Sequence, residues 1–212
     1  MKTTKKALLF TFCAVLLVVA SVLGTMAYLT SSETVTNTFT VGKVNIDLDE
    51  AKVDKNGDVV SPEERVKANT YHLLPGHEYV KDPTVTVEAG SEESYVRMIV
   101  TINEQSDLDA IFAPNGLPLG NFFGGVSSEW TLYSETENAD DTRSYEFRYK
   151  ETVAAPDGDV VLDDLFETIK VPGEITKEQL ETISDLKIEV EAHAIQADGF
   201  ADADAAWAAF KK

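Results

Sequence analysis

Apolar and polar residues alternate along most of the chain after residue 42, in short runs separated by turn residues. The alternating runs are residues 44–48, 85–87, 96–102, 130–132, 143–150 and 188–194. A period of two is typical of strands that bury one face and expose the other. Dipeptides such as Asn56-Gly57, Pro75-Gly76 and Pro172-Gly173 predict the turns between them. The pattern predicts a mainly all-β fold, an antiparallel jelly-roll β-sandwich formed by residues 42–212.

Three short stretches favour peripheral helices. Residues 107–112 are compatible with one helical turn or two. Thr176 and Gln179 have the spacing of a capping box, which predicts a helix running to about Ser184. Residues 201–210 are rich in alanine, and Trp207 and Phe210 would form one apolar edge against the sheet.

The first 27 residues have the order of a secretory signal peptide. Three lysines precede an apolar or small stretch over residues 7–23, and small residues follow it. Thr25 and Ala27 fit the two pockets of a signal peptidase, so we expect cleavage between Ala27 and Tyr28. The apolar run of 17 residues is long for a signal, and the alternative is an uncleaved anchor.

The charge excludes polyanionic partners. The chain has 37 acidic and 18 basic residues and a formal charge of −19, which becomes −22 without the three lysines of residues 1–27. Such a surface repels nucleic acid and anionic membranes. The one cysteine, Cys13, lies within the signal, so the exported chain would have no disulfide, which points to a bacterial or archaeal surface.

Many of the charged side chains are expected to be solvated. Asp47, Asp49 and Glu50, with Asp163 and Asp164, would form a solvated acidic surface. In the run 143–150, the positions between the aromatic residues would face water. These positions are Ser144, Glu146, Arg148 and Lys150.

A strand-forming segment lies close to the new N-terminus. Its residues are Thr34, Val35, Thr36, Asn37, Thr38, Phe39, Thr40 and Val41. The threonines would occupy one face of the strand and the other residues the opposite face, and β-propensity is high. Such a segment either pairs within its own sheet or leaves to complete a neighbour's sheet by β-strand addition. The pattern alone allows both.

The N-terminal region resembles the TasA/camelysin family. The resemblance is carried by Gly24-Thr25-Met26-Ala27-Tyr28-Leu29-Thr30, residues 37–42 and the strand at 43–48. It continues through residues 74–78 and 95–102, and the end, residues 194–200 with Ala206-Trp207, is similar to the closing segment of many clostridial members.

The resemblance implies a surface or biofilm-matrix protein of a Gram-positive bacterium, with a signal peptide processed by the peptidase SipW. It also implies a jelly-roll domain that assembles into fibres, with residues 28–41 supplying a donor strand to the next subunit. Expected partners are other copies of the chain, the SipW-type peptidase during export and other matrix proteins. The alternative is a monomeric secreted adhesin or accessory matrix protein of the same fold.

Enzyme chemistry has little support in the sequence. Related camelysin-like proteins have been classed as metallopeptidases, but a common zinc peptidase needs two histidines one helical turn apart beside a glutamate. Here His77-Glu78 is followed by Lys81 where the second histidine would stand, so the HExxH motif is absent. The other two histidines are His72 and His193, and a three-histidine site would require the fold to bring all three side chains together. We expect no catalytic residue.

No cofactor is expected, and calcium is the one cation considered. Asp198, Asp202 and Asp204 are the acidic group that could attract it. Their position before a predicted helix explains them as capping residues without a metal. Asp54-Lys55-Asn56-Gly57-Asp58 resembles half of a calcium loop, but its glycine is misplaced, and a hairpin turn explains it better.

Overall fold

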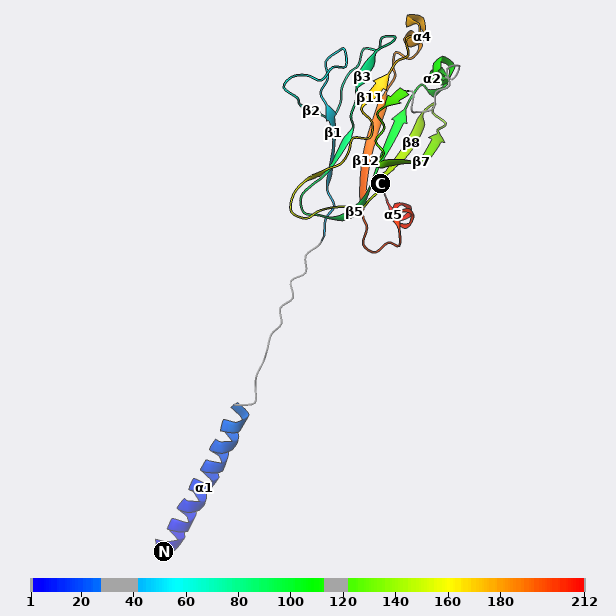
Figure 1. The fold of residues 1–212 in the computed structure, drawn as a ribbon. Coiled ribbons are helices and arrows are strands. Elements are labelled where there is room, and N and C mark those ends of the chain that lie inside the picture. Colours follow the sequence, from blue (N-terminus) through cyan, green and yellow to red (C-terminus); the bar gives the residue numbers. More distant parts are fainter. Residues whose placement is uncertain (1, 28–41, 113–121, 212) are drawn as a thin grey trace. The chain divides into compact units, whose positions relative to one another are not determined.

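The computed structural model describes residues 2–27, 42–112 and 122–211, divided into a unit over residues 1–41 and a unit over residues 42–212 (Figure 1). In the first unit, α1 (Lys2–Ala27) is a helix with exposed apolar side chains such as Leu8 and Phe10. No helix among the described residues combines the length and apolar character needed to cross a membrane. Tyr28 and the predicted donor strand, residues 34–41, lie outside the described residues.

The second unit is built from antiparallel strands. In order, they are β1 (Ile46–Ala51), β2 (Arg65–Val66), β3 (Glu78–Val80), β4 (Thr84–Val87), β5 (Ser91–Ile102), β6 (Phe123–Gly124), β7 (Trp130–Glu137), β8 (Arg143–Tyr149), β9 (Val153–Ala155), β10 (Val160–Val161), β11 (Thr168–Lys170) and β12 (Ile188–Gln196). Their paired orders are β10-β4-β1-β2, β3-β11-β6 and β12-β5-β8-β7, with β9 also paired to β5. The predicted all-β class is confirmed.

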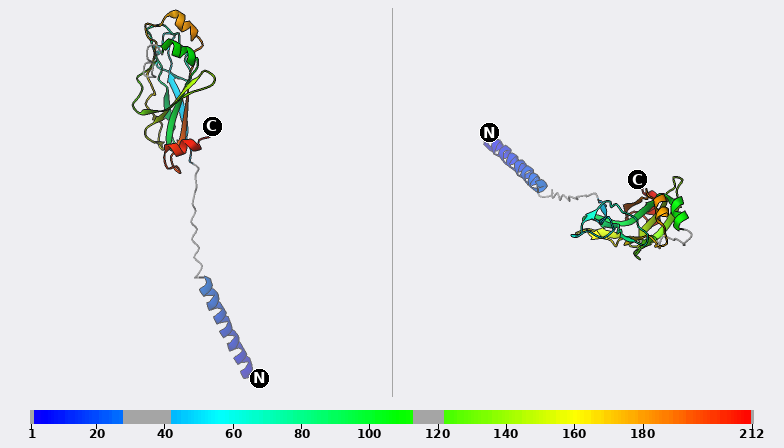
Figure 2. Two further views of the ribbon diagram at one scale, coloured as in Figure 1. Left: turned by 90° about the vertical axis from the view of Figure 1, so that its right-hand side faces the viewer. Right: turned by 90° about the horizontal axis from the view of Figure 1, so that it is seen from above.

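The helices of this unit are short and peripheral, as predicted. α2 (Gln105–Phe112) and α4 (Lys177–Thr182) lie at one end of the strands and α5 (Ala203–Ala209) at the other (Figures 1 and 2). The capping box of α4 is confirmed, because Gln179 N–H donates to Thr176 Oγ1 at 3.3 Å and Thr176 N–H donates to Gln179 Oε1 at 2.9 Å.

One hydrophobic core joins the sheets. The central strand β5 contributes Val96, Met98 and Val100, all essentially inaccessible to solvent, and β4 contributes Val85 and Val87. An aromatic group continues the core toward α2 and the loop before β11. Its members are Phe112, Phe122, Phe123 and Phe166, and the rings of Phe123 and Phe166 lie 4.3 Å apart between centroids. Phe122 and Phe123 therefore pack inward.

The expectation of a solvated acidic surface at residues 47–50 holds for Asp47, which is 48% exposed, but not for Asp49 and Glu50, at 22% and 8%. Each carboxylate meets a cation from a distant segment of the chain. The pairs are Asp47 with Lys67, Asp49 with Arg65 and Glu50 with Lys81. Glu50 is buried with its partner, at 8% and 7% side-chain exposure. Sequence alternation does not show such pairs, because their members are brought together only by the pairing of β1 with β2 and by the position of Lys81 after β3.

The polar face of β8 is also less solvated than predicted. Glu146 and Arg148 have side-chain exposures of 17% and 14%. The outer face of the sheet is partly covered by α5, because Arg148 reaches Asp204 on that helix at 2.5 Å. The C-terminal helix α5 therefore covers part of a β8 face that the sequence pattern predicts to be exposed to solvent.

Candidate functional site

The outer edge of β12 offers backbone groups to which another strand could bond. β12 is the terminal strand of its sheet, and among the described residues it pairs with β5 alone. Antiparallel strands direct the backbone groups of alternate residues to opposite sides. The direction is fixed here because Ala197 N–H donates to Glu93 O at 2.8 Å and Asn103 N–H donates to Lys187 O at 3.3 Å. Odd-numbered residues of β12 therefore bond to β5, and even-numbered residues direct N–H and C=O outward.

The outward-directed residues also form an apolar row. Ile188, Val190, Ala192 and Ala194 are partly buried against the common core. Their side chains point to the interior between the sheets while their backbone groups point to the edge. A further strand added here would both complete hydrogen bonds and extend the core, which are the two sources of affinity in β-strand addition.

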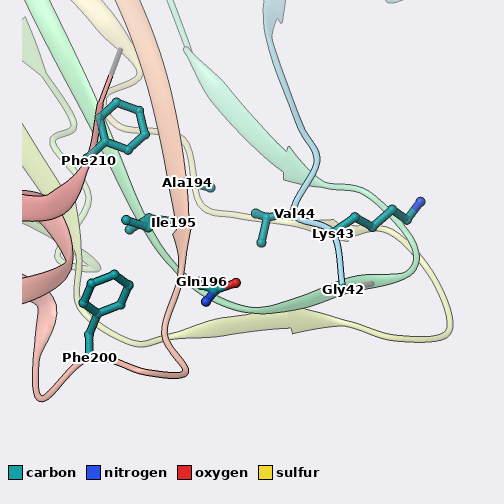
Figure 3. Close-up of a pocket in the computed structure, with 8 residues that line it drawn as sticks. All are labelled: Gly42, Lys43, Val44, Ala194, Ile195, Gln196, Phe200 and Phe210. Carbon is teal, nitrogen blue, oxygen red and sulfur yellow. The ribbon is translucent and has the colours of Figure 1, made fainter. Parts of the chain in front are cut away.

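A hollow of about 370 Å³ lies at the C-terminal end of this edge. Figure 3 shows Ala194, Ile195 and Gln196 between two walls. One wall is formed by Phe200 and Phe210 and the other by residues 42–44, the first residues of the domain. The place where the chain enters the domain is therefore beside the edge of β12.

Contacts from the sheet hold the aromatic wall in position. The guanidinium carbon of Arg97, on β5, lies 4.4 Å from the ring centre of Trp207 and 5.1 Å from that of Phe210. The ring of His193 lies 4.9 Å from Phe210, and Arg97 Nε donates to His193 Nδ1 at 3.3 Å. α5 is thus anchored to β5 and β12, and Phe210 is held over the edge.

The acidic residues considered for calcium have separate partners. Asp202 is the N-cap of α5, and its carboxylate accepts the Ala205 N–H at 2.8 Å. Asp204 pairs with Arg148, and this hydrogen bond holds the pKa of Asp204 below its usual value. Asp198 accepts the amide of Gln196 through its backbone carbonyl at 3.2 Å. Within the described residues, no group of three histidine, cysteine or acidic side chains could hold a metal ion.

The histidines occupy different parts of the domain. The His77 ring lies 5.9 Å from that of Tyr79, and the backbone carbonyl of His72 accepts the Tyr79 hydroxyl at 2.8 Å. His193 lies on β12. Lys81, which stands at the position of the missing second histidine, is buried beside Glu50. Ala27 ends α1, so the predicted cleavage site follows the last residue of that helix.

Sequence reasoning did not identify the edge of β12. The alternation of residues 188–194 predicts the strand, but whether a strand is central or terminal depends on pairing across the whole sheet. Comparisons of the chain with protein-family models, with curated proteins and with solved structures found no match.

Proposed function

We propose that the chain is an exported structural protein of the bacterial surface or biofilm matrix, and that its jelly-roll domains polymerise into extracellular fibres. After removal of residues 1–27, the segment Thr34–Val41 of one subunit adds as a strand to the outer edge of β12 in the next. The observation that carries the proposal is the edge itself: outward backbone groups along an apolar row.

The lengths and faces of the two strands are compatible. β12 has nine residues, and the donor segment has eight. At about 3.4 Å per residue, they extend about 30 and 27 Å. The donor's apolar positions include Val35, Phe39 and Val41. These would continue the core beside Ala192 and Ala194, whose small side chains leave room for the Phe39 ring.

Entry of the chain beside the edge supports exchange between subunits. Because residues 42–44 line the hollow at the end of β12, the described part of the domain begins next to an acceptor edge. The direction that the chain takes at residues 42–44 would decide whether the donor segment pairs with the domain of its own subunit or with that of a neighbouring subunit. Domain-swapped assemblies use the same relation between a hinge and an exchanged element.

The test is assembly of the mature chain beginning at Tyr28. Negative-stain microscopy and sedimentation should reveal filaments of regular width. Deletion of residues 28–41 should abolish filaments while far-UV circular dichroism stays native. Filaments from the deleted chain would overturn the proposal, and a folded wild-type chain that stays monomeric would favour the secreted adhesin or accessory matrix protein.

A matched pair of proline variants tests which edge accepts the strand. Ala192→Pro removes an N–H that points away from β5, so it should prevent addition at β12 without breaking the existing sheet. Leu132→Pro makes the same change on β7, the strand at the other end of this sheet, where Leu132 lies opposite Phe147 and points its N–H away from β8. We expect filaments from Leu132→Pro and none from Ala192→Pro. The reverse result would place the acceptor on β7.

A further inference from the structure

A buried carboxylate connects a buried lysine and a partly buried asparagine. Glu50 lies on β1, Asn69 follows β2, and Lys81 directly follows β3. Lys81 Nζ donates to Glu50 Oε2, and Asn69 Nδ2 donates to Glu50 Oε1 at 2.9 Å. The amine and the side-chain amide are therefore held on the two oxygens of one carboxylate, with Glu50 and Lys81 both less than a tenth exposed.

The amide of Asn69 is fixed at both of its polar atoms. Its Nδ2 also donates to the carbonyl of Ala51 at 2.8 Å. Its Oδ1 accepts the backbone N–H of Val53 at 3.0 Å. The second contact polarises the amide carbonyl and would stabilise negative charge on Oδ1, as the donors of an oxyanion hole do.

An aromatic side chain closes the site. The ring centre of Tyr71 lies 6.0 Å from Lys81 Nζ, and the Tyr71 hydroxyl donates to the carbonyl of Val80 at 3.1 Å. Burial and the charge of Glu50 raise the pKa of Tyr71, so the phenol stays neutral. The buried ion pair thus lies beside a neutral aromatic side chain, in a setting where keeping two opposite charges out of water is costly.

We propose that Lys81 and Asn69 form an intramolecular amide bond between Nζ and Cγ, with release of ammonia. Glu50 takes a proton from the Lys81 ammonium, and the neutral Nζ attacks Cγ of Asn69. Charge develops on Oδ1 beside the Val53 N–H. Nζ, now bonded to Cγ, loses a second proton. The bond from Cγ to Nδ2 then breaks, and Nδ2 leaves as ammonium after it receives protons through Glu50. The carboxylate is regenerated, and no oxidant or reductant is needed.

Such a bond would give this domain what a disulfide gives other exported domains. The exported chain contains no cysteine. A link from Asn69 to Lys81 would close the connection between β2 and β3 and reduce the conformational freedom of the unfolded chain. It would also resist pulling forces along a fibre, although its formation does not depend on assembly.

The intact mass of the purified chain, measured after denaturation, tests the bond directly. The linked chain is lighter than its sequence by the mass of ammonia, about 17 Da. Trypsin should fail to cleave after Lys81 and should yield residues 68–97 as one internally linked peptide with the same deficit. The full sequence mass, in freshly purified protein and after prolonged incubation in the folded state, would overturn the proposal. A deficit of about 18 Da, or a link between other residues, would also overturn it.

Two variants assign the roles. Glu50→Gln keeps the shape of the side chain but cannot take up the proton, so it should restore the full mass in a chain whose circular dichroism is native. Glu64→Gln is the matched control, because Glu64 pairs with Lys52 at 2.7 Å in a solvent-exposed position. It should keep the deficit of about 17 Da. A folded Glu50→Gln chain that retains the deficit would refute the role of Glu50.

Discussion

Replacement of Arg148 by methionine should loosen α5 from the sheet. Arg148 Nε donates to Glu146 at 2.6 Å, and Nη1 donates to Asp204 at 2.5 Å. The guanidinium carbon lies 3.3 Å from the ring centre of Tyr133. Methionine keeps the apolar stem and removes all three contacts. Because α5 lies between Phe200 and Phe210, which form the aromatic wall beside β12, the variant tests how firmly that wall is attached.

The exposures of the partners determine the expected magnitude. Asp204 is 68% exposed, so solvent screens its ion pair and this contact contributes little to stability. Glu146 is 17% exposed, but after the change it keeps Arg97 at 3.5 Å, which limits the penalty of leaving its charge without a partner. The cation–π contact adds about 0.5–1 kcal/mol. Together, these terms predict that the free energy of unfolding falls by about 1–3 kcal/mol.

Urea unfolding followed by tryptophan fluorescence measures this loss, and Lys170→Met provides the control. Lys170 pairs with Glu78 at 3.2 Å with exposures of 46% and 52%, so its replacement should cost less than about 1 kcal/mol. Hydrogen exchange should show that the extra opening of Arg148→Met is concentrated in α5. Equal small losses in the two variants, with unchanged exchange in α5, would refute the reasoning.

The same contact has a defined pH dependence. The hydrogen bond from Arg148 lowers the pKa of Asp204 in the folded chain below its ordinary value of 3.8. A lowered carboxyl pKa contributes stability above the unfolded-state value, and this contribution is lost as the pH falls through the folded-state value. In Arg148→Met, acid exchange of α5 should therefore depend less on pH below about 4.

Four further predictions follow from the core, the capping box, a buried acid and the net charge. Phe166→Ala should lower the free energy of unfolding in urea by about 3–5 kcal/mol, because the ring is fully buried against Phe123. Thr176→Ala should lower it by about 0.5–2 kcal/mol through loss of the α4 cap. Burial raises the pKa of Asp164, so Asp164→Asn should raise the thermal midpoint at neutral pH, and this gain should vanish below about pH 4, where the native acid is protonated too. Salt, or acidification to about pH 5, should increase filament yield in sedimentation assays, because subunits of charge −22 repel one another; a yield that stays flat would contradict this.

The sequence predicts the strands well because each one buries a single face. The alternation at Val96, Met98 and Val100 becomes the central strand β5, and the alternation at 188–194 becomes β12. The capping box of α4 is equally local, since its two side chains lie three residues apart. Such features depend on neighbours in the chain, and a sequence records those neighbours directly.

The features that define both proposed sites are not local. Lys81 and Glu50 are 31 residues apart, and neither residue type predicts burial. Arg148 and Asp204 are separated by 56 residues. Likewise, the alternation of β12 would be the same in a central strand and in a terminal one. Only the order of the strands shows which backbone groups are directed away from the sheet.

The two ends of the large sheet differ in a way that favours assembly at β12. The second half of β7 has Glu135 and Glu137, both bridged to Arg143, and charges of this kind protect an open edge from pairing. β12 also has two glutamates, Glu189 and Glu191, but its even-numbered residues, whose backbone groups point outward, are apolar from Ile188 to Ala194. This apolar row favours addition of another strand, while the charge of −22 opposes close approach of two subunits. If the proposed assembly occurs, it therefore depends on whether the surrounding ions screen that charge.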